Sequence, residues 1–486
     1  MFIQAGRALT AGAPRTRAPG RAWPAPGEGE PEPLRWAASG AMALTGAASA
    51  PPRLAPGGVV TRADALLAAL RAAAPDPARL PRDAGALLGE RAALAGLRRN
   101  GRIAAGGRAR LLCAADGWIA VQLARPDDVA LLPAWLEVDP ARFEGDPWPA
   151  LAAAVRDRAA VPLVARARWM GLPAAAAGGG SAEGGAPGMD AKPPLAEARR
   201  AGDAPPSAAE ARPADGAPPR VEAPPALRVT QAGTPRRRHA GPWRVLDLSS
   251  LWAGPLATHL LAGLGARVAK VESTARPDGA RRGPAAFFDL LQAGKESVAL
   301  DFRAPAGREQ LRRLVAWADL VVESARPRAL AQLGLDAEAL LAEHPGLSWL
   351  SITGYGRPEP GGGWVAFGDD AAVAGGLVAR DDDGAPLFCG DAIADPLAGL
   401  HAAWAALGAL RAGGGRLLDV SLAGVAAEAA AGGVDPRACV VADAGGARVL
   451  CAGRSARVAE PRARRPAGRA RDLGADTTAL LREARA

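Results

Sequence analysis

The sequence predicts an α/β protein with a doubly wound, Rossmann-like parallel sheet and a second, smaller α+β domain. From Trp243 onward, short apolar runs alternate with helix-length segments, which is typical of parallel strands joined by crossover helices. The first strand leads into a helix through a tight turn, as in a βαβ unit. A Gly- and Pro-rich stretch over 174–241 separates this domain from an earlier globular region.

The chain before that stretch predicts a leader and a small domain. Residues 1–33 are basic at first and contain no continuous apolar core, so we expect a disordered leader rather than a signal peptide. Residues 34–173 are expected to form the smaller domain. Its predicted elements are a helix at 63–73, strands at 109–114 and 118–124 around Asp116 and Gly117, and a helical stretch at 147–173.

The stretch 174–241 consists mainly of Gly, Pro, Ala, Ser and charged residues. A segment of this composition buries too little apolar area to offset the entropy of the chain. We therefore expect a disordered linker there, followed by the main domain at 242–486. The predicted strands of that domain are 244–252, 266–272, 297–302, 319–324 and 347–356, and its predicted helices include 256–265, 307–318 and 337–345.

A dinucleotide-binding enzyme is the obvious alternative for a chain with this βαβ start. Glu272 ends the second predicted strand, where such enzymes bind ribose hydroxyls. The first turn, however, reads LWAGPLATHL, with Pro255 in the turn and without the G-x-G-x-x-G spacing. This argues against NAD or FAD, and a nucleotide-like ligand at the strand ends stays open.

The segment from Cys389 to Arg411, CGDAIADPLAGLHAAWAALGALR, predicts a buried helix preceded by small and acidic residues. Pro396 suits the first helical position, and Asp395 suits the capping position before it. On the local pattern alone, Asp395 is a helix cap. The alternative is that its carboxylate acts as a nucleophile.

Composition excludes several classes of protein. The four Cys form no C-x-x-C pair and the four His form no H-E-x-x-H motif, so we expect a reduced, cytoplasmic protein without a metal site. No run of eighteen apolar residues predicts a membrane span. Arg is spread through the chain without a module that reads nucleic acid, so no nucleic-acid partner is expected.

Six segments resemble, in the same order, those of the class III CoA-transferases, the family of formyl-CoA transferase, carnitine CoA-transferase and alpha-methylacyl-CoA racemase. They are RVLDLSSLWAGPLATHLLAGLGARVAKVE, GKESVALDFRAPAGREQLRRLVAWADLVVES, RPRALAQLGLD, LSWLSITGYG, GDAIADPLAGLHAAWAALGAL and, at the end of the chain, RRPAGRARDLGADTTALLREA. The fifth matches the catalytic segment, in which an Asp is followed by Gly and often by His.

The resemblance implies that Asp395 attacks an acyl-CoA thioester and then carries CoA as an aspartyl thioester, with CoA as a substrate and no permanently bound cofactor. Positions matching CoA contacts are Trp252, Ala253, Leu300, Arg303, Ser324 and Arg326, and Arg328 is a further candidate for binding phosphate. Candidates for supporting roles are Gly354, Gly356, Asp369, Gly390, Gly399 and His401. Backbone N–H groups of the Gly-rich turns are candidate donors to an oxyanion.

The chain also departs from the family's pattern. Only a short stretch, about 422–448, stands where the family has a further small domain, and 34–173 resembles that domain instead. Residues 36–54 resemble the segment before the catalytic Asp, but the position matching Asp395 falls near Thr61, so this copy keeps no nucleophile. We expect a tandem or permuted arrangement in which the N-terminal half is a lid or a degenerate copy.

Three functions remain open. The first is an acyl-CoA:carboxylate CoA-transferase, which the resemblance implies is a homodimer. The second is an acyl-CoA racemase or epimerase, in which a His–Asp pair precedes the catalytic Asp; here Asp369 stands at the His position, which favours transfer. The third is a CoA-binding protein without turnover.

Overall fold

The computed structural model describes residues 29–178, 223–443 and 446–485. The expected leader, apart from its last residues, and most of the expected linker therefore lie outside the described residues. No helix within these ranges is long and apolar enough to cross a membrane.

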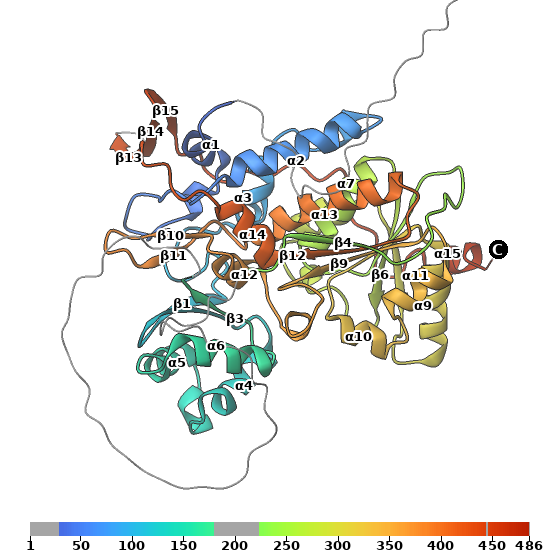
Figure 1. Cartoon of the computed structure of the whole chain (residues 1–486), viewed down its shortest axis with the longest axis horizontal. Helices are drawn as coiled ribbons and strands as arrows, with labels where there is room; N and C mark the ends of the chain where they lie inside the picture. Colours follow the sequence, from blue (N-terminus) through green and yellow to red (C-terminus); the bar gives the residue numbers. More distant parts are fainter. Residues whose placement is uncertain (1–28, 179–222, 444–445, 486) are drawn as a thin grey trace, which may run out of the picture.

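A seven-stranded sheet forms the centre of the molecule (Figure 1), with the strand order β4-β12-β9-β8-β5-β6-β7. All neighbouring strands are parallel except β4, which pairs with β12 in the antiparallel sense. The strands are β4 (Leu227–Gln231), β5 (Arg244–Asp247), β6 (Arg267–Ser273), β7 (Glu296–Leu300), β8 (Leu320–Glu323), β9 (Ser348–Thr353) and β12 (Arg416–Ser421). The predicted doubly wound parallel sheet is confirmed.

Helices cover both faces of this sheet because alternate strand residues point to opposite sides. Val245 and Val268 belong to one apolar core, and Leu246 and Val271 to the other. The first core includes residues from α7 (Ala253–Gly263), α8 (Ala285–Gln292), α12 (Gly368–Ala374), α13 (Ala394–Arg411) and α14 (Leu422–Ala430). The second includes residues from α9 (Pro305–Trp317), α10 (Pro327–Gln332), α11 (Ala337–Glu343) and α15 (Thr477–Glu483).

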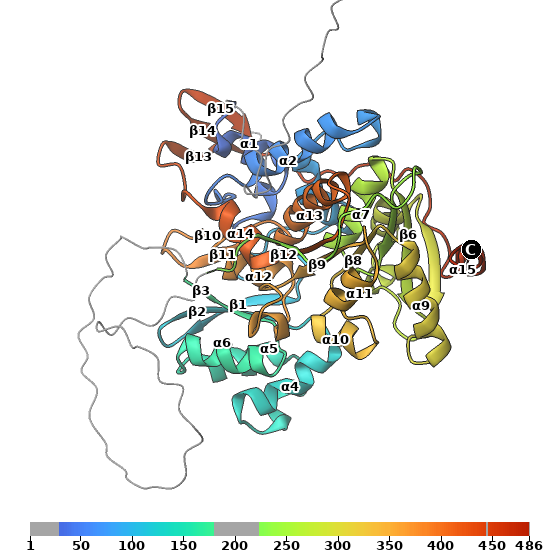
Figure 2. The same cartoon turned by 45° about the vertical axis from the view of Figure 1, so that its right-hand side comes forward.

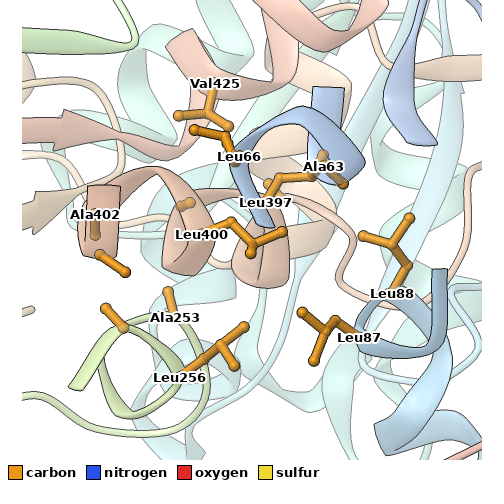
Figure 3. Packing of buried hydrophobic residues seen from close by; sticks show 14 of the residues in the cluster. Ala63, Leu66, Leu87, Leu88, Ala253, Leu256, Leu397, Leu400, Ala402 and Val425 are labelled. Atoms are coloured by element: carbon orange, nitrogen blue, oxygen red, sulfur yellow. The ribbon is translucent and has the colours of Figure 1, made fainter. Parts of the chain in front are cut away.

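The N-terminal half contributes three helices directly to the first core. These are α1 (Glu32–Ser39), α2 (Val59–Ala73) and α3 (Ala84–Ala95). Figure 3 shows Leu66 of α2 and Leu87 of α3 gathered around Leu397 and Leu400 of α13. The first part of the expected small domain is therefore built into the main domain.

The rest of that region forms a separate small α+β unit (Figure 2). Its antiparallel sheet has the order β1-β2-β3, with β1 (Ala109–Ala114), β2 (Gly117–Gln122) and β3 (Ala174–Ala177). One face packs on α4 (Pro126–Leu136), α5 (Pro147–Val155) and α6 (Ala160–Trp169), and the other meets α12 and β11 (Pro386–Phe388). The predicted helical stretch 147–173 is thus two helices separated at 156–159.

The expected linker 174–241 requires a correction at its ends, because β3 and β4 both lie inside it. Ala174–Ala177 pair with Trp118–Val121, and β4 pairs with β12 along its whole length. Strand pairing uses backbone groups, so an Ala run or a short polar segment completes a sheet without an apolar pattern of its own. Residues 179–222 lie outside the described residues.

Two small sheets and the C-terminal tail complete the fold. Two small antiparallel sheets, β10-β11 (Val378–Arg380 and Pro386–Phe388) and β13-β14-β15 (Ala438–Asp443, Gly446–Cys451 and Arg454–Arg457), flank the N-terminal helices. The tail then crosses to β7, where the carboxylate of Asp476 accepts a hydrogen bond from the amide of Ser297 at 2.8 Å. Leu480 of α15 is fully buried there.

Candidate active site

Asp395 lies in the first turn of α13, near the helix mouth as the sequence predicts, but it is not the cap. The helix begins at Ala394 and its cap is Ile393, for which no side-chain capping bond is present. The backbone amide of Asp395 donates to the carbonyl of Ala392 at 2.9 Å. Its carboxylate is therefore not occupied in capping the helix.

The exposure of Asp395 sets it apart from its surroundings. Every other residue in the described stretch 385–403 is buried, and Asp395 alone is partly exposed. A charged group is expensive to place in such a segment unless it is paired or used. The sequence thus presents one reachable carboxylate from an otherwise buried segment.

Asp395 belongs to a cluster of acidic side chains. Burial raises the pKa of Asp395 to about 7, Arg91 lowers it, and the carboxylates of Asp369 and Asp391 raise it further. A hydrogen bond from the backbone amide of Gly368 favours the charged form. A Cβ atom placed on Gly368 would lie 2.3 Å from the Oδ2 atom of Asp395, so only glycine leaves room for the carboxylate.

One of these acids, Asp369, holds the backbone that leads into α13. Asp369 accepts a hydrogen bond from the amide of Ala392 at 2.8 Å, and burial raises its pKa to about 6. Gly390 and Ala392 both have positive φ, at 64° and 44°. Asp369 therefore holds a sharply turned loop in the backbone before α13.

Asp391 is fully buried and is paired with Arg91 of α3 from the N-terminal half. The Nε atom of Arg91 donates to Oδ2 of Asp391 at 2.8 Å, and Nη2 donates to Oδ1. The same guanidinium lies over the ring of Trp252, 5.4 Å from its centroid. Arg91 thus links the acidic cluster to the turn after β5.

A second arginine from the N-terminal half interacts with Asp370, the residue after Asp369. The guanidinium of Arg168 in α6 stacks on Tyr355 and Trp364, at 4.2 and 4.7 Å from the ring centroids. It acts electrostatically on Asp370, a fully buried acid whose pKa is raised to about 8, chiefly by burial. Asp370 accepts from the amide of Phe367 at 2.7 Å, so it fixes the start of α12.

The residues expected to contact CoA follow the carboxyl ends of β5, β7 and β8. The strand order reverses beside β5, and ligands of doubly wound sheets bind in the crevice at such a point. Trp252 and Ala253 start α7 and are buried. Ser324 accepts a hydrogen bond from the amide of Ser250 at 3.1 Å, which joins the loops after β8 and β5.

The other expected CoA contacts are more dispersed. Leu300 is buried at the end of β7, and Arg303 is exposed and bonded to Asp301. Arg326 caps α10, and Arg328 lines a separate cavity of about 170 Å³ beside Glu323. The structure does not bring these side chains up to Asp395.

The expected supporting glycines serve mainly to shape the backbone. The amides of Gly356 and Gly390 already donate, to the hydroxyls of Thr353 and Thr45, at 2.9 and 2.8 Å. They are therefore not free oxyanion donors in this conformation. A Cβ atom on Gly354 would lie 2.6 Å from that of Ala366.

Gly399 and His401 lie within α13. A Cβ atom on Gly399 would meet the carbonyl oxygen of Ala253 at 2.8 Å, so glycine is required for the close approach of α13 to α7. His401 is fully buried in the same helix, six residues beyond Asp395. The Asp–Gly–His spacing therefore combines one candidate nucleophile with a packing position and a core residue.

Sequence reasoning missed Arg91, Arg168 and Asp391. Arg91 and Asp391 are 300 positions apart in the chain. Neither arginine lies in a motif, and each is one of many in an Arg-rich sequence. In the sequence, Asp391 stands only among the small and acidic residues that precede the helix. Within the described ranges, no group of His, Cys, Asp and Glu has the geometry to hold a metal ion.

The main domain is similar in sequence to known proteins. Residues 242–435 match the family described as CoA-transferase family III. A succinyl-CoA–D-citramalate CoA-transferase of Chloroflexus aurantiacus is 35% identical over 192 residues, which cover 37% of this chain and 48% of the relative. A succinate–glutarate CoA-transferase of Agrobacterium fabrum is 34% identical over 198 residues, covering 37% and 50%.

Among solved structures, a CAIB/BAIF family protein from Brucella suis is similar, with 30% sequence identity and a TM-score of 0.40. The match covers 46% of this chain and 67% of that one. The chain spans about half the length of the curated relatives it matches.

Proposed function

We propose that the protein moves CoA from an acyl-CoA donor to a carboxylic acid through a covalent intermediate on Asp395. The match of residues 242–435 to CoA-transferase family III supports this proposal. The observation that carries this proposal is the partly exposed carboxylate of Asp395 in an otherwise buried segment. Arg91 connects it to Trp252, at the turn where CoA contacts are expected.

The proposed chemistry needs no added base. An Oδ atom of Asp395 attacks the acyl carbon of the donor, the C–S bond breaks, and CoA leaves as a thiolate. The thiolate attacks the aspartyl carbonyl of the mixed anhydride and releases the donor acid. An acceptor carboxylate then attacks the aspartyl thioester, and the returning thiolate converts the second anhydride into the new acyl-CoA and free Asp395.

The environment of Asp395 supports this use. A carboxylate is a weak nucleophile in water, and withdrawing it from solvent makes its charge less stabilised. Because burial and two neighbouring acids raise its pKa to about 7, the ionised form is present near neutral pH without being strongly stabilised. The fixed loop 389–393 supplies the orientation that covalent catalysis requires.

Racemisation is the second candidate, and one observation favours it. Three neighbouring acids have pKa values raised into the neutral range, to about 6, 7 and 8 for Asp369, Asp395 and Asp370. Groups with separated, near-neutral pKa values suit proton exchange. Asp369 and Asp370, however, are buried and accept hydrogen bonds from the backbone amides of Ala392 and Phe367, so we place this function second.

The test is intact-protein mass spectrometry after mixing with succinyl-CoA, with and without hydroxylamine, on the wild type and Asp395→Asn. We expect a CoA or acyl adduct that maps to Asp395 and is absent from the variant. Uptake of solvent deuterium alpha to the thioester, without an adduct, would instead indicate a racemase. CoA binding with neither result would indicate a binding protein without turnover.

Several finer expectations stay with this proposal. We propose that the protein is a homodimer acting in the cytoplasm, with one acyl-CoA and one carboxylic acid as substrates and no resident cofactor. Light scattering on the purified protein tests the dimer, and a monomeric mass at micromolar concentration would contradict it.

A further inference from the structure

We propose that Arg91 is a positioning residue of the Asp395 site, so that the N-terminal half, which lies outside the matched family segment, completes the site. Its guanidinium holds Asp391 and places a positive charge beside the carboxylate of Asp395. The inference rests on the proposed function of Asp395, but it concerns a residue that the family segment does not contain.

The contact between Arg91 and Asp391 has the geometry of a strong ion pair. Two nitrogens of the guanidinium donate to the two oxygens of one carboxylate, the fork-to-fork arrangement that arginine makes best. Asp391 has no exposed surface, whereas the side chain of Arg91 keeps 30% of its own. The side chain of Arg91 is therefore partly exposed, whereas the carboxylate that it pairs with is not.

An aromatic ring and a glycine lie next to the guanidinium of Arg91. It lies over the ring of Trp252, and a Cβ atom on Gly106 would approach its Nη2 atom to 3.3 Å and Oδ1 of Asp391 to 3.8 Å. Gly106 also belongs to the N-terminal half. Arg91 is thus confined between a residue of its own half and the turn after β5.

The helix that carries Arg91 is itself anchored. The adjacent Glu90 is fully buried and accepts two hydrogen bonds from the guanidinium of Arg464, at 2.9 and 3.0 Å. Arg464, in the C-terminal tail, therefore helps to hold α3 in its position. A further contact, from the amide of Gly390 to Thr45, ties the same half to the loop before Asp395.

The charged groups around Asp395 show what the positive charge of Arg91 does. The groups that face Asp395 are Asp369 from α12, Asp391 from the loop before α13, Arg91 from α3, and the amide of Gly368. Arg91 is the only cation among them. It offsets the two neighbouring acids, and without it the buried charge of Asp391 would act on Asp395 uncompensated.

Arg53 provides a matched control. It also comes from the N-terminal half and pairs with acids of the other half, reaching the two oxygens of Asp382 at 2.6 Å each. Asp382 is largely exposed and lies in the turn after β10. Losing Arg53 removes an arginine–aspartate pair between the halves without altering the acidic cluster.

The experiment compares Arg91→Gln, Arg91→Lys, Asp391→Asn and Arg53→Gln with the wild type. The first readout is the pH midpoint of adduct formation from succinyl-CoA. The second needs no substrate: the infrared band of a protonated carboxyl group, assigned to Asp395 by its loss on Asp395→Asn in each background. Thermal melting records any loss of stability.

We expect Arg91→Gln to move the midpoint upward by about one pH unit or more, because an opposite charge close by shifts a carboxyl pKa by about 1–3 units. Asp391→Asn removes a negative neighbour and moves the midpoint downward. Arg91→Lys keeps the charge and falls between Arg91→Gln and the wild type, and Arg53→Gln leaves the midpoint unchanged.

A merely structural role predicts a different pattern. Arg91→Gln and Asp391→Asn would then lower the melting temperature together and leave both midpoints at the wild-type value, which would overturn the proposal. If the wild type forms no adduct, the proposed function fails, and the infrared midpoint still decides the role of Arg91.

Discussion

At the scale of single residues, Asp395 combines a partly exposed position with an electrostatic cost. Burial and the acids Asp369 and Asp391 disfavour its charge, and Arg91 and the amide of Gly368 favour it. The balance leaves the carboxyl group about half ionised at neutral pH, because its pKa is about 7. Both the activity and the stability of the protein should therefore respond to pH around this value.

The first prediction concerns the activity. Only the ionised carboxylate is a nucleophile, so the rate of adduct formation from succinyl-CoA should rise with pH through about 7 and level off above it. Stopped-flow quenching followed by mass spectrometry at several pH values measures this profile. A profile already flat from pH 5 upward would show that the pKa of Asp395 is not raised.

The second prediction concerns stability. The pKa of Asp395 in the folded state lies above its ordinary value of 3.8, so the folded protein binds more protons than the unfolded chain between about pH 4 and 7. Stability is therefore lost as the pH rises through this window. Asp395→Asn avoids the loss and should raise the free energy of unfolding by about 1–2 kcal/mol at pH 8, allowing for partial solvent access.

Urea unfolding at pH 8 and pH 5 tests this second prediction. The gain from Asp395→Asn should be larger at pH 8, and it should accompany a complete loss of the adduct. An equal effect at both pH values would mean that the substitution acts through packing rather than charge.

At the scale of elements, the position of Asp395 depends on how closely α13 approaches α7. Leu256 of α7 and Leu400 of α13 lie together in the main core (Figure 3). Gly399 allows this approach, since a Cβ atom there would meet the carbonyl of Ala253 at 2.8 Å and the side chain of Leu256 at 3.0 Å. Close packing of this kind tolerates added volume poorly.

The third prediction follows from that contact. Gly399→Ala should destabilise the protein by about 1–3 kcal/mol, because the added methyl group forces α13 away from α7. Gly408→Ala is the matched control in the same helix, where nothing lies within 4 Å of the new Cβ atom. That variant should be neutral or stabilising by about 0.5–1 kcal/mol. Comparable melting temperatures for the two variants would contradict the packing argument.

The elements differ in how well the sequence predicts them. The strands β6 and β8 and the helix α9 are predicted to within about two residues because their apolar patterns match the two faces of the sheet. The strands β3 and β4 were missed because they complete a sheet through backbone bonds and carry no such pattern. In the site, Asp395 was found by its resemblance to a family segment, whereas Arg91 gave no local signal.

At the scale of the whole molecule, the two halves of the chain share one core. Leu34, Trp36, Leu66 and Leu87 come from the N-terminal half and are buried with residues of α7 and α13. Pairing between distant parts of the chain cannot be read from periodicity, which reports only that a face is apolar and not what covers it. The expected separation into two domains therefore holds only for the unit around β1, β2 and β3.

The fourth prediction tests this shared core by cutting the chain. With a protease site inserted between 179 and 222, the cleaved halves should remain associated and keep the ability to form the adduct. Six large side chains of the N-terminal half alone, each worth roughly 1.5–3 kcal/mol when buried, together contribute as much as a typical folding free energy of about 5–15 kcal/mol. They are Leu34, Trp36, Leu66, Leu70, Leu87 and Leu88.

For the same reason, residues 223–486 produced alone should be insoluble or unfold without cooperativity, and producing residues 29–178 in the same cells should restore a soluble complex. Light scattering of the cleaved protein distinguishes one particle from two. If 223–486 folds alone with a sharp melting transition and forms the adduct, the N-terminal half contributes neither to the core nor to the Asp395 site. A soluble but inactive 223–486 would instead separate the two roles, leaving Arg91 as the contribution that the main domain lacks.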